Sequence, residues 1–422
     1  MSNPRAIAFQ VLVDVREKDA YVNLLLPELI KDAQLEPRDA AFATELTHGT
    51  IRRQGTYDAI IDSLATSTVD PDVREALRLG AHQLLSMRVP DHAAVKTTVD
   101  LVRRTTGHRA IGFANAILRR ISQKSLEQWI EQLGAGMTRT ERLALEHSHP
   151  EWIVQALEDA VTATVGAEEL EALLAADNER PKVTLVARPG LCDPDDLPGT
   201  PGRLSPWARI LPGGDPGAVP QVRDGHAGVQ DEGSQLVALT LAEAPVEGTD
   251  SHWLDLCAGP GGKSALLGAL AAQRGGTVVA NEPQAHRADL VRHSVRALRN
   301  VQVTEFDGRE GPWEEESFDR VLVDAPCTGL GALRRRPEAR WRRSPDAVFE
   351  LVALQVDLLD RALELVRPGG VVGYATCSPH LAETDEVVQS LGRDDVTVES
   401  VHRWWPHRDG TDAMYLAVLR RH

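Results

Sequence analysis

The chain has 422 residues, 42% of them hydrophobic and 26% charged, which is enough to build more than one sizeable core. The formal net charge of −16 taken alone argues against a nucleic-acid partner, although binding depends on where charges cluster and not on their sum. The four cysteines form no CxxC pair and no disulfide-like framework. Near the start of the chain, Asp14, Glu17 and Asp19 interrupt any profile that would resemble a signal peptide. We therefore expect a cytoplasmic protein with reduced thiols and no membrane span.

The first part of the chain is predicted to be helical. Apolar residues recur three and four positions apart in stretches such as VREALRLGAHQLLSM and IGFANAILRRI, and no alternating strand pattern interrupts them. We expect an all-α bundle over residues 1–135 and further helices to about residue 178. Prolines and glycines then crowd residues 188–225, so the region 136–227 is predicted to be a helical linker followed by a small, ordered connector subdomain.

From about residue 228 the pattern alternates between strands and helices. HWLDLC, TVVANE, VQVTEF, DRVLVDAP and VVGYATCS have the apolar character of buried strands, and helical stretches separate them. This pattern is typical of a doubly wound, Rossmann-like α/β sheet, which we expect over residues 228–422. The last two strands, near Val396 and over residues 414–419, have no helix between them and could end the sheet as an antiparallel pair.

The stretch LDLCAGPGGKS, residues 254–264, is a glycine turn that matches neither familiar nucleotide loop. A Walker A loop needs a glycine where Cys257 stands, and the dinucleotide fingerprint needs one where Ser264 stands. What remains is a strand ending in Asp255, a tight turn and a helix start, which offers a carboxylate to a cation and backbone N–H groups to an anion. A ligand with both charges fits, such as the methionine portion of S-adenosyl-L-methionine.

Carboxylates at the next strand ends support a nucleoside ligand. Glu282 ends the following strand, where it can accept hydrogen bonds from ribose hydroxyls. Asp307 follows the strand after that, in a position to meet an adenine edge. A strand–helix turn without a ligand is the alternative, but a turn followed by two such carboxylates favours the nucleoside.

Two cysteines follow strands that end at the same edge of this predicted sheet. A thiolate from Cys327 or Cys377 that adds to carbon 6 of cytosine would make carbon 5 nucleophilic enough to accept a methyl group. The second thiol could then assist proton removal or release, and Asp324 could hydrogen-bond the base or hold the donor. Free cysteines are more often small buried hydrophobes, which is our interpretation of Cys192 and of the Cys257 side chain. The residues alone leave open which thiol attacks.

Three motifs, DLCAGPGGK, DAPCTGLGALRRRPEARW and TCSP, resemble those of the RNA cytosine-5 methyltransferases of the RsmB/Nop/Sun group. RAIAFQVLVDV and HAAVKTTVDLVRR in turn look like the NusB-type RNA-binding domain. The resemblance implies a class I methyltransferase fold and methylation of a cytosine in small-subunit (16S) ribosomal RNA. It also implies that Cys377 is the nucleophile and that Cys327 aids release. Many relatives have alanine where Gly259 stands, and we expect glycine to be tolerated in this tight turn.

The same resemblance carries the donor site over to this chain residue by residue. The candidate cofactor-binding residues are Cys257, Ala258, Gly259, Pro260, Gly261, Gly262, Lys263, Glu282, Asp307 and Asp324.

Two stretches with clustered basic residues are candidate RNA-binding surfaces. Residues 101–126 hold basic and no acidic residues, and residues 330–343 hold arginines beside an aromatic, which suits phosphates and a stacked base. The second stretch follows the Cys327 loop and is expected at the mouth of the active site. The candidates are Arg103, Arg104, Arg119, Arg120, Arg334, Arg335, Arg336, Arg340 and Trp341.

We therefore expect a monomeric RNA methyltransferase without a metal. One alternative is a DNA cytosine-5 methyltransferase, in which Cys327 would be the attacking thiol. Another is a non-catalytic NusB-like RNA-binding factor with a degenerate enzyme domain. A nucleotide hydrolase is disfavoured by Cys257.

Overall fold

The computed structural model describes residues 3–422, which fold into two compact units. The first, here called the helical unit, comprises the chain up to residue 158 together with residues 168–178 and 333–342. The second, here called the sheet unit, comprises residues 159–167, 179–332 and 343–422. The sequence predicted breaks near residues 135 and 227, whereas in the structure the helical part extends to residue 178 and the chain returns to it after residue 332.

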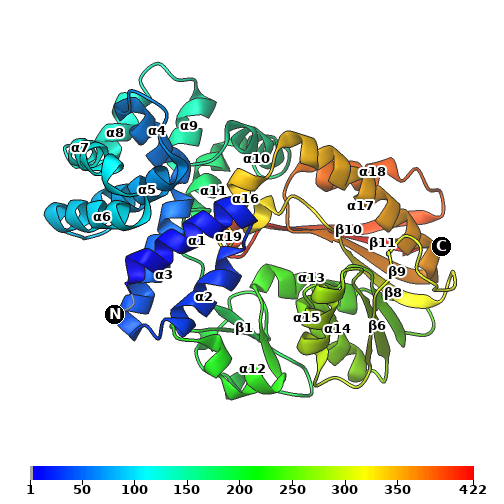
Figure 1. The fold of residues 1–422 in the computed structure, drawn as a ribbon. Coiled ribbons are helices and arrows are strands. Elements are labelled where there is room, and N and C mark those ends of the chain that lie inside the picture. The colour runs from blue at the N-terminus through cyan, green and yellow to red at the C-terminus, as the bar shows by residue number, and fades with distance from the viewer. Residues whose placement is uncertain (1–2) are drawn as a thin grey trace. The chain divides into compact units, whose positions relative to one another are not determined.

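The helical unit is all-α, as predicted (Figure 1). The elements are α1 (Pro4–Lys18), α2 (Val22–Asp32), α3 (Pro37–Arg52), α4 (Gln54–Leu64), α5 (Pro71–Leu85), α6 (Asp91–Thr105), α7 (Ile111–Ile121), α8 (Leu126–Leu133), α9 (Arg139–His147), α11 (Leu170–Ala176) and α16 (Ala339–Arg342). Side-chain caps begin four of these helices, α1, α5, α8 and α9. Asp70, for example, precedes Pro71, the first residue of α5, and its side chain accepts hydrogen bonds from the backbone N–H groups of Asp72 and Val73. Helix α10 (Glu151–Thr164) is divided between the two units.

Arg340 explains why residues 333–342 belong to the helical unit. Its guanidinium is fully buried and donates to the carbonyls of Arg52 (3.0 Å), Ser148 (3.2 Å) and Asp177 (2.7 Å). These carbonyls stand at the C-terminal ends of α3, α9 and α11, where helices carry unpaired acceptors and partial negative charge. One guanidinium therefore satisfies three helix ends. Burial lowers the pKa of Arg340 to about 10, which leaves the group charged at neutral pH.

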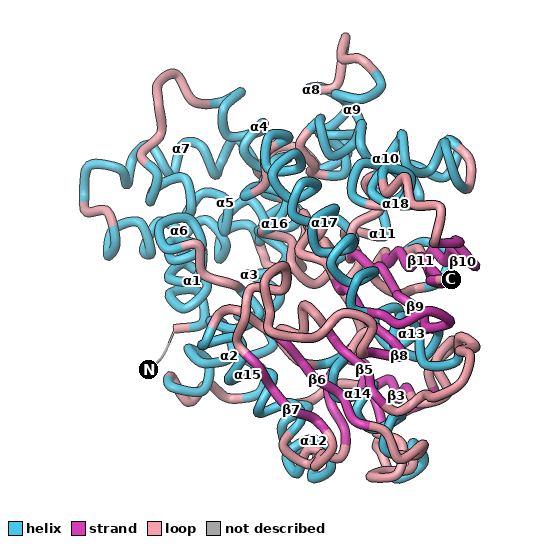
Figure 2. The backbone as a smooth tube through the Cα atoms, turned by 90° about the vertical axis from the view of Figure 1, so that its right-hand side faces the viewer, coloured by secondary structure: helices cyan, strands magenta, loops and turns pink. Residues whose placement is uncertain are grey.

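The sheet unit is built on a seven-stranded sheet with the order β10-β11-β9-β8-β5-β6-β7, drawn in magenta in Figure 2. Strands β7, β6, β5, β8 and β9 are parallel neighbours, and β11 is antiparallel to both β9 and β10. Both the doubly wound sheet and its antiparallel end are therefore confirmed. The strands are β5 (His252–Asp255), β6 (Thr277–Asn281), β7 (Val301–Thr304), β8 (Phe318–Asp324), β9 (Val366–Thr376), β10 (Val396–Trp404) and β11 (Met414–Arg421).

Helices cover both faces of this sheet, which is why its central strands are apolar on both sides (Figure 1). Along β8, Val321 and Val323 pack with α17 on one face, whereas Leu322 packs with α13 and α14 on the other. The helices of the sheet unit are α13 (Glu232–Glu243), α14 (Gly262–Ala272), α15 (Ala285–Val295), α17 (Pro345–Leu365), α18 (Asp385–Ser390) and α19 (Pro406–Asp409).

The proline- and glycine-rich connector forms a small antiparallel sheet with its own apolar core, which includes Leu185, Leu197 and Leu211. Its elements are β1 (Thr184–Ala187), β2 (Thr200–Pro201), β3 (Ala208–Ile210), β4 (Ala227–Val229) and the short helix α12 (Pro220–Asp224). Nowhere in residues 3–422 does a helix have both the length and the apolar character that crossing a bilayer requires.

Candidate active site

The predicted site residues of the sheet unit gather at the carboxyl edge of the parallel strands. Asp255 ends β5, Asp324 ends β8 and Cys377 directly follows β9. These strands are neighbours, and their register pairs Asp255 with Leu322 and Asp324 with Ala375. The carboxylates and the thiol therefore share one edge, which is where doubly wound sheets bind their ligands.

The two candidate catalytic sulfurs are in contact. Cys327 Sγ lies 3.4 Å from Cys377 Sγ, and both residues are half-buried. The loops that carry them are also joined through the backbone, because Gly331 N–H donates to the Cys377 carbonyl at 2.8 Å. The hydrogen bond to Cys377, together with burial, raises the pKa of Cys327 well above its ordinary value. Cys327 is therefore held as a neutral thiol that can donate to the sulfur of Cys377.

A buried ion pair links the glycine turn to the cysteines. Lys263, in the first turn of α14, places its Nζ 2.8 Å from Asp324 Oδ2. Burial opposes the charge on Lys263, but Asp324 and the Cys377 sulfur outweigh it and raise the pKa of the ammonium. The ammonium is close enough to Cys377 to interact electrostatically with it, so a thiolate at Cys377 would be favoured.

Asp255 provides the clearest test of whether the turn fits the donor. It is fully buried, its Oδ2 accepts from Ser264 Oγ at 2.6 Å, and its Oδ1 has no hydrogen-bond partner. Burial raises the pKa of Asp255 to about 7. The ammonium of a methionine portion would supply the missing partner, so the residue fits the proposed ligand. The sequence did not identify Ser264 as a site residue, because it stood out only as the residue that breaks the dinucleotide fingerprint. No sequence pattern indicated that the Ser264 hydroxyl orients the Asp255 carboxylate.

Two glycines shape the turn for different reasons. Gly261 has φ +107°, and a Cβ there would lie 2.9 Å from Val291 Cα, so a side chain is excluded by both conformation and space. A Cβ at Gly259 would lie 2.1 Å from Glu282 Oε2. We expect glycine to be tolerated at position 259. In this chain, an alanine at that position would have to displace the Glu282 carboxylate.

The remaining donor carboxylates differ in their surroundings. Glu282 follows β6, is almost fully buried and accepts from the backbone N–H of Gln284 at 3.1 Å. Asp307 follows β7, is exposed and is held by Arg309, whose hydrogen bonds lower the pKa of Asp307. Both carboxyl groups lie just beyond strand ends, where a nucleoside site requires hydrogen-bond acceptors.

The first basic stretch is exposed in the helical unit. Arg103 and Arg104 lie in the last turn of α6, and Arg119 and Arg120 lie in the last turn of α7. A groove of ≈ 700 Å³ runs between the two helices, and its lining includes Arg103, Arg119, Lys96, His92 and Asn115. The four arginines stay candidates for contact with RNA phosphates.

The second basic stretch is not the exposed cluster that the sequence suggested. Arg334 and Arg340 are buried, Arg335 is half-buried and the Trp341 indole packs on the core of the helical unit. Only Arg336 among the five candidates is exposed, and its guanidinium lies 5.9 Å from the centre of the Tyr21 ring. The structure does not support the expectation that Arg340 contacts RNA, because its guanidinium is fully buried and donates to the carbonyls of three helix ends.

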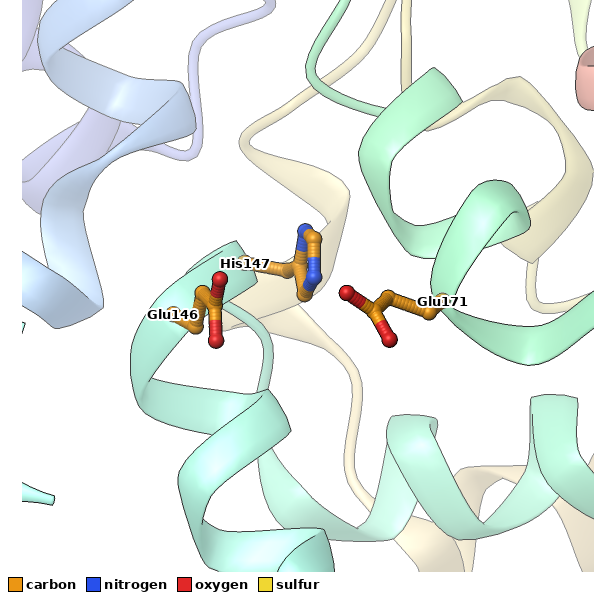
Figure 3. A group of neighbouring side chains, drawn as sticks. All are labelled: Glu146, His147 and Glu171. Carbon is orange, nitrogen blue, oxygen red and sulfur yellow. The ribbon is translucent and has the colours of Figure 1, made fainter.

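One group in the helical unit has the composition of a cation site. Ligand atoms of Glu146, His147 and Glu171 lie within 4.8 Å of one another, with the imidazole between the two carboxylates (Figure 3). Burial lowers the pKa of His147, and the charges of Arg53 and Arg340 lower it further. The two glutamates act in the opposite direction and raise it, but the net shift is downward. The same guanidinium groups would repel a divalent cation, so we assign no metal to this group.

Comparison with known proteins adds an independent line of evidence. Residues 240–420 match the family described as 16S rRNA methyltransferase RsmB/F, and residues 2–123 match the NusB family. A putative methyltransferase of Mycobacterium tuberculosis is 50% identical over 99% of this chain and 96% of its own length. A probable ribosomal RNA small subunit methyltransferase B of Bacillus subtilis is 30% identical over 99% of this chain and 98% of its own. The solved structure of PH0851 shares the fold with a TM-score of 0.79 at 23% identity, over 100% of this chain and 98% of that one.

Proposed function

The chain belongs to the RsmB/F family of 16S rRNA methyltransferases, which use S-adenosyl-L-methionine, and we propose that it methylates carbon 5 of a cytosine in small-subunit ribosomal RNA. The proposal rests chiefly on one observation, the 3.4 Å contact between Cys327 Sγ and Cys377 Sγ at the edge that also holds Lys263 and Asp324. Carbon 5 chemistry needs a nucleophile for carbon 6 and a way to release it afterwards, and a pair of thiols supplies both.

We propose that the turn and the strand ends hold the donor. S-adenosyl-L-methionine, when bound, supplies an electrophilic methyl group on its sulfonium. Asp255 would bind the ammonium of its methionine portion, the 257–263 turn would bind the carboxylate, and Glu282 would accept from the ribose hydroxyls. Asp307 would lie against the adenine edge. Support comes from the unpartnered Asp255 Oδ1 and from the close fit of Gly259 beside Glu282.

In the first half of the proposed reaction Cys377 is the nucleophile. The Lys263 ammonium favours the Cys377 thiolate, which forms a bond to carbon 6 of the cytosine. The electron pair of the carbon 5–carbon 6 double bond moves to carbon 5, which is then able to take a methyl group. Asp324, oriented by its 2.8 Å contact with Lys263, can accept from the exocyclic amino group of the base.

In the second half of the proposed reaction the covalent adduct has to be resolved. The proton on carbon 5 leaves to water, its electron pair restores the double bond, and the pair of the sulfur–carbon 6 bond returns to Cys377. Cys327 is placed to donate its S–H hydrogen bond to the departing sulfur, since its raised pKa keeps it protonated. This division of roles agrees with the one that the family resemblance implied.

The experiment that tests the proposal uses RNA and DNA containing 5-fluorocytosine. Fluorine cannot leave as the proton does, so the enzyme should remain covalently attached to the RNA, and peptide mapping should find the bond at Cys377. Attachment to DNA through Cys327 would instead indicate a DNA methyltransferase. Calorimetry that detects no binding of S-adenosyl-L-methionine would indicate a non-catalytic RNA-binding factor. Bisulfite sequencing of ribosomal RNA from a deletion strain would then identify the cytosine.

A further inference from the structure

A fully buried carboxylate lies beneath the two cysteine loops and takes no part in the reaction just described. Glu383, in a short turn of 3-10 helix at Leu381–Glu383, has no exposed surface. Its Oε1 accepts from Thr328 N–H at 2.7 Å, and its Oε2 accepts from the Thr328 hydroxyl. Thr328 directly follows Cys327, so the carboxylate holds both polar groups of the residue next to the thiol.

The same carboxylate reaches the second cysteine loop through Thr328. The Thr328 hydroxyl donates its hydrogen bond to Glu383, so the Ser378 hydroxyl, 3.1 Å away, is the donor to Thr328. Ser378 directly follows Cys377 and is fully buried. A chain of hydrogen bonds therefore runs from one cysteine loop through Thr328 to Glu383.

Gln355, from α17, completes the support around Cys327. Its Nε2 donates to the Pro326 carbonyl at 2.8 Å and to Glu383 Oε1 at 3.2 Å. Residues 326 and 328 are thus held on both sides of the thiol, one through Gln355 and the other through Glu383. The Tyr374 hydroxyl, which donates to the Glu383 carbonyl at 2.7 Å, fixes the carboxylate's own backbone.

Cys377 has anchors that do not depend on Glu383. It continues from Thr376, which is paired with Tyr415 in the sheet, and the Thr376 hydroxyl bonds to the Ser378 carbonyl at 2.9 Å. The loop of Cys327 is held at its two ends by backbone bonds, from Ala325 N–H to the Ala375 carbonyl and from Gly331 N–H to the Cys377 carbonyl, both at 2.8 Å. Between these ends, the residues on either side of Cys327 are held by Gln355 and Glu383. Removing the carboxylate should therefore displace Cys327 more than Cys377.

We propose that Glu383 is a positioning residue that fixes the Cys327 thiol against Cys377 for the release step. The inference deepens the proposed function and rests on it, because release is a separate step only if an adduct forms. Its signature is a selective defect, in which the adduct forms normally and resolves slowly. Displacements of about 1 Å from a remote change can cost on the order of 100-fold in rate, which is the scale expected here.

The test compares Glu383→Ala and Glu383→Gln with a matched control, Glu232→Ala. Glu232 is also a buried carboxylate of the sheet unit and accepts two backbone N–H groups, from Leu204 (2.8 Å) and Ser205 (2.9 Å), but it touches neither cysteine loop. Glutamine can keep the Glu383 contacts, since its carbonyl can face Thr328 N–H and its amide can donate to a rotated Thr328 hydroxyl.

With unmodified RNA and donor, Glu383→Ala should lose on the order of 100-fold in turnover and accumulate a slow-migrating adduct on a denaturing gel. Glu383→Gln should rescue most of the turnover, and Glu232→Ala should turn over like the parent protein. Calorimetry with S-adenosylhomocysteine should give the same dissociation constant for all four proteins.

Two outcomes would overturn the inference alone. One is normal turnover by Glu383→Ala, and the other is an equal loss in Glu383→Ala and Glu232→Ala without any adduct. If Glu383→Ala fails to fold, Thr328→Val, which removes only the hydroxyl between the loops, should show a smaller accumulation of adduct, and its absence would count against the inference. A parent protein that forms no adduct even with 5-fluorocytosine RNA would overturn the proposed function itself.

Discussion

Cys327 Sγ lies 3.4 Å from Cys377 Sγ although the two residues follow different strands and are 50 positions apart. The contact joins a thiol whose pKa is raised to a sulfur that interacts with the Lys263 ammonium. The two sulfurs are therefore chemically unequal, and their substitution should have unequal effects.

The first prediction follows from that inequality. Cys377→Ser should abolish both turnover and adduct formation, because a serine hydroxyl is a far weaker nucleophile than a thiolate. Cys327→Ser should still attack and methylate but remain attached to its RNA, visible as a slow band on a denaturing gel. Free release of product by Cys327→Ser would show that the roles are divided differently.

The second prediction concerns pH and donor binding. The raised pKa of Asp255, about 7, means that the carboxyl of the free protein is largely protonated at pH 6 and ionised at pH 8. An ammonium binds the ionised form, so affinity for S-adenosylhomocysteine should fall about tenfold per unit as pH drops below that pKa, with proton release on binding. Asp255→Asn should bind more weakly and lose this dependence in calorimetry.

A matched change at Asp307 tests the assignment. The hydrogen bonds from Arg309 lower the pKa of Asp307, so this residue is already ionised across the same range. Asp307→Asn should therefore leave the slope of affinity against pH unchanged. A slope that persists in Asp255→Asn would place the titrating group elsewhere.

The third prediction concerns the glycine beside Glu282. Gly259→Ala should weaken donor binding about tenfold, because its Cβ would displace the Glu282 carboxylate, and a hydrogen bond to a charged group contributes about 1.5–3 kcal/mol. Gly112→Ala is the control, since Gly112 lies in α7, away from the donor turn, and its Cβ would meet no atom within 4 Å. Equal affinities for both variants would mean that Glu282 does not contact the donor.

The fourth prediction concerns the exposed arginines of α6 and α7. Arg104→Ala and Arg119→Ala should each weaken RNA binding and lower the slope of log affinity against log salt by roughly one unit, if each contacts one phosphate. Arg309→Ala, an exposed arginine of the sheet unit already paired with Asp307, serves as a comparison and should leave the slope unchanged. Filter binding over a range of salt concentrations would measure this.

Sequence patterns predicted what repeats along the chain and what stands at strand ends. The parallel strands, the antiparallel end and the strand-end positions of Asp255, Asp324 and Cys377 all follow from local periodicity, because parallel strands align their carboxyl ends. Contacts between distant segments left no such trace. The support of Cys327 by Glu383, and the burial of Arg340, depend on pairings far apart in the chain.

Arg340 shows most clearly why an arginine-rich stretch can mislead. The sequence RRRPEARW has the composition of a nucleic-acid contact, but helix C-terminal carbonyls attract a guanidinium for the same electrostatic reason that phosphates do. Which acceptor an arginine meets is decided by tertiary packing. Here the carbonyls of Arg52, Ser148 and Asp177 converge on one point, so Arg340 stabilises the fold.

The last prediction measures that contribution. Arg340→Ala should lower the free energy of unfolding by about 3–5 kcal/mol, because three buried helix ends would lose their shared donor. Arg343→Ala, three residues on and exposed, should change it by less than about 0.5 kcal/mol. Urea titrations followed by circular dichroism would compare the two variants. Arg340→Lys should recover only part of the lost stability, since one ammonium cannot reach all the acceptors that a planar guanidinium reaches. If Arg340→Ala were as stable as the parent but defective in RNA binding, the arginine would be contacting RNA after all, and the structural role assigned to it would be wrong.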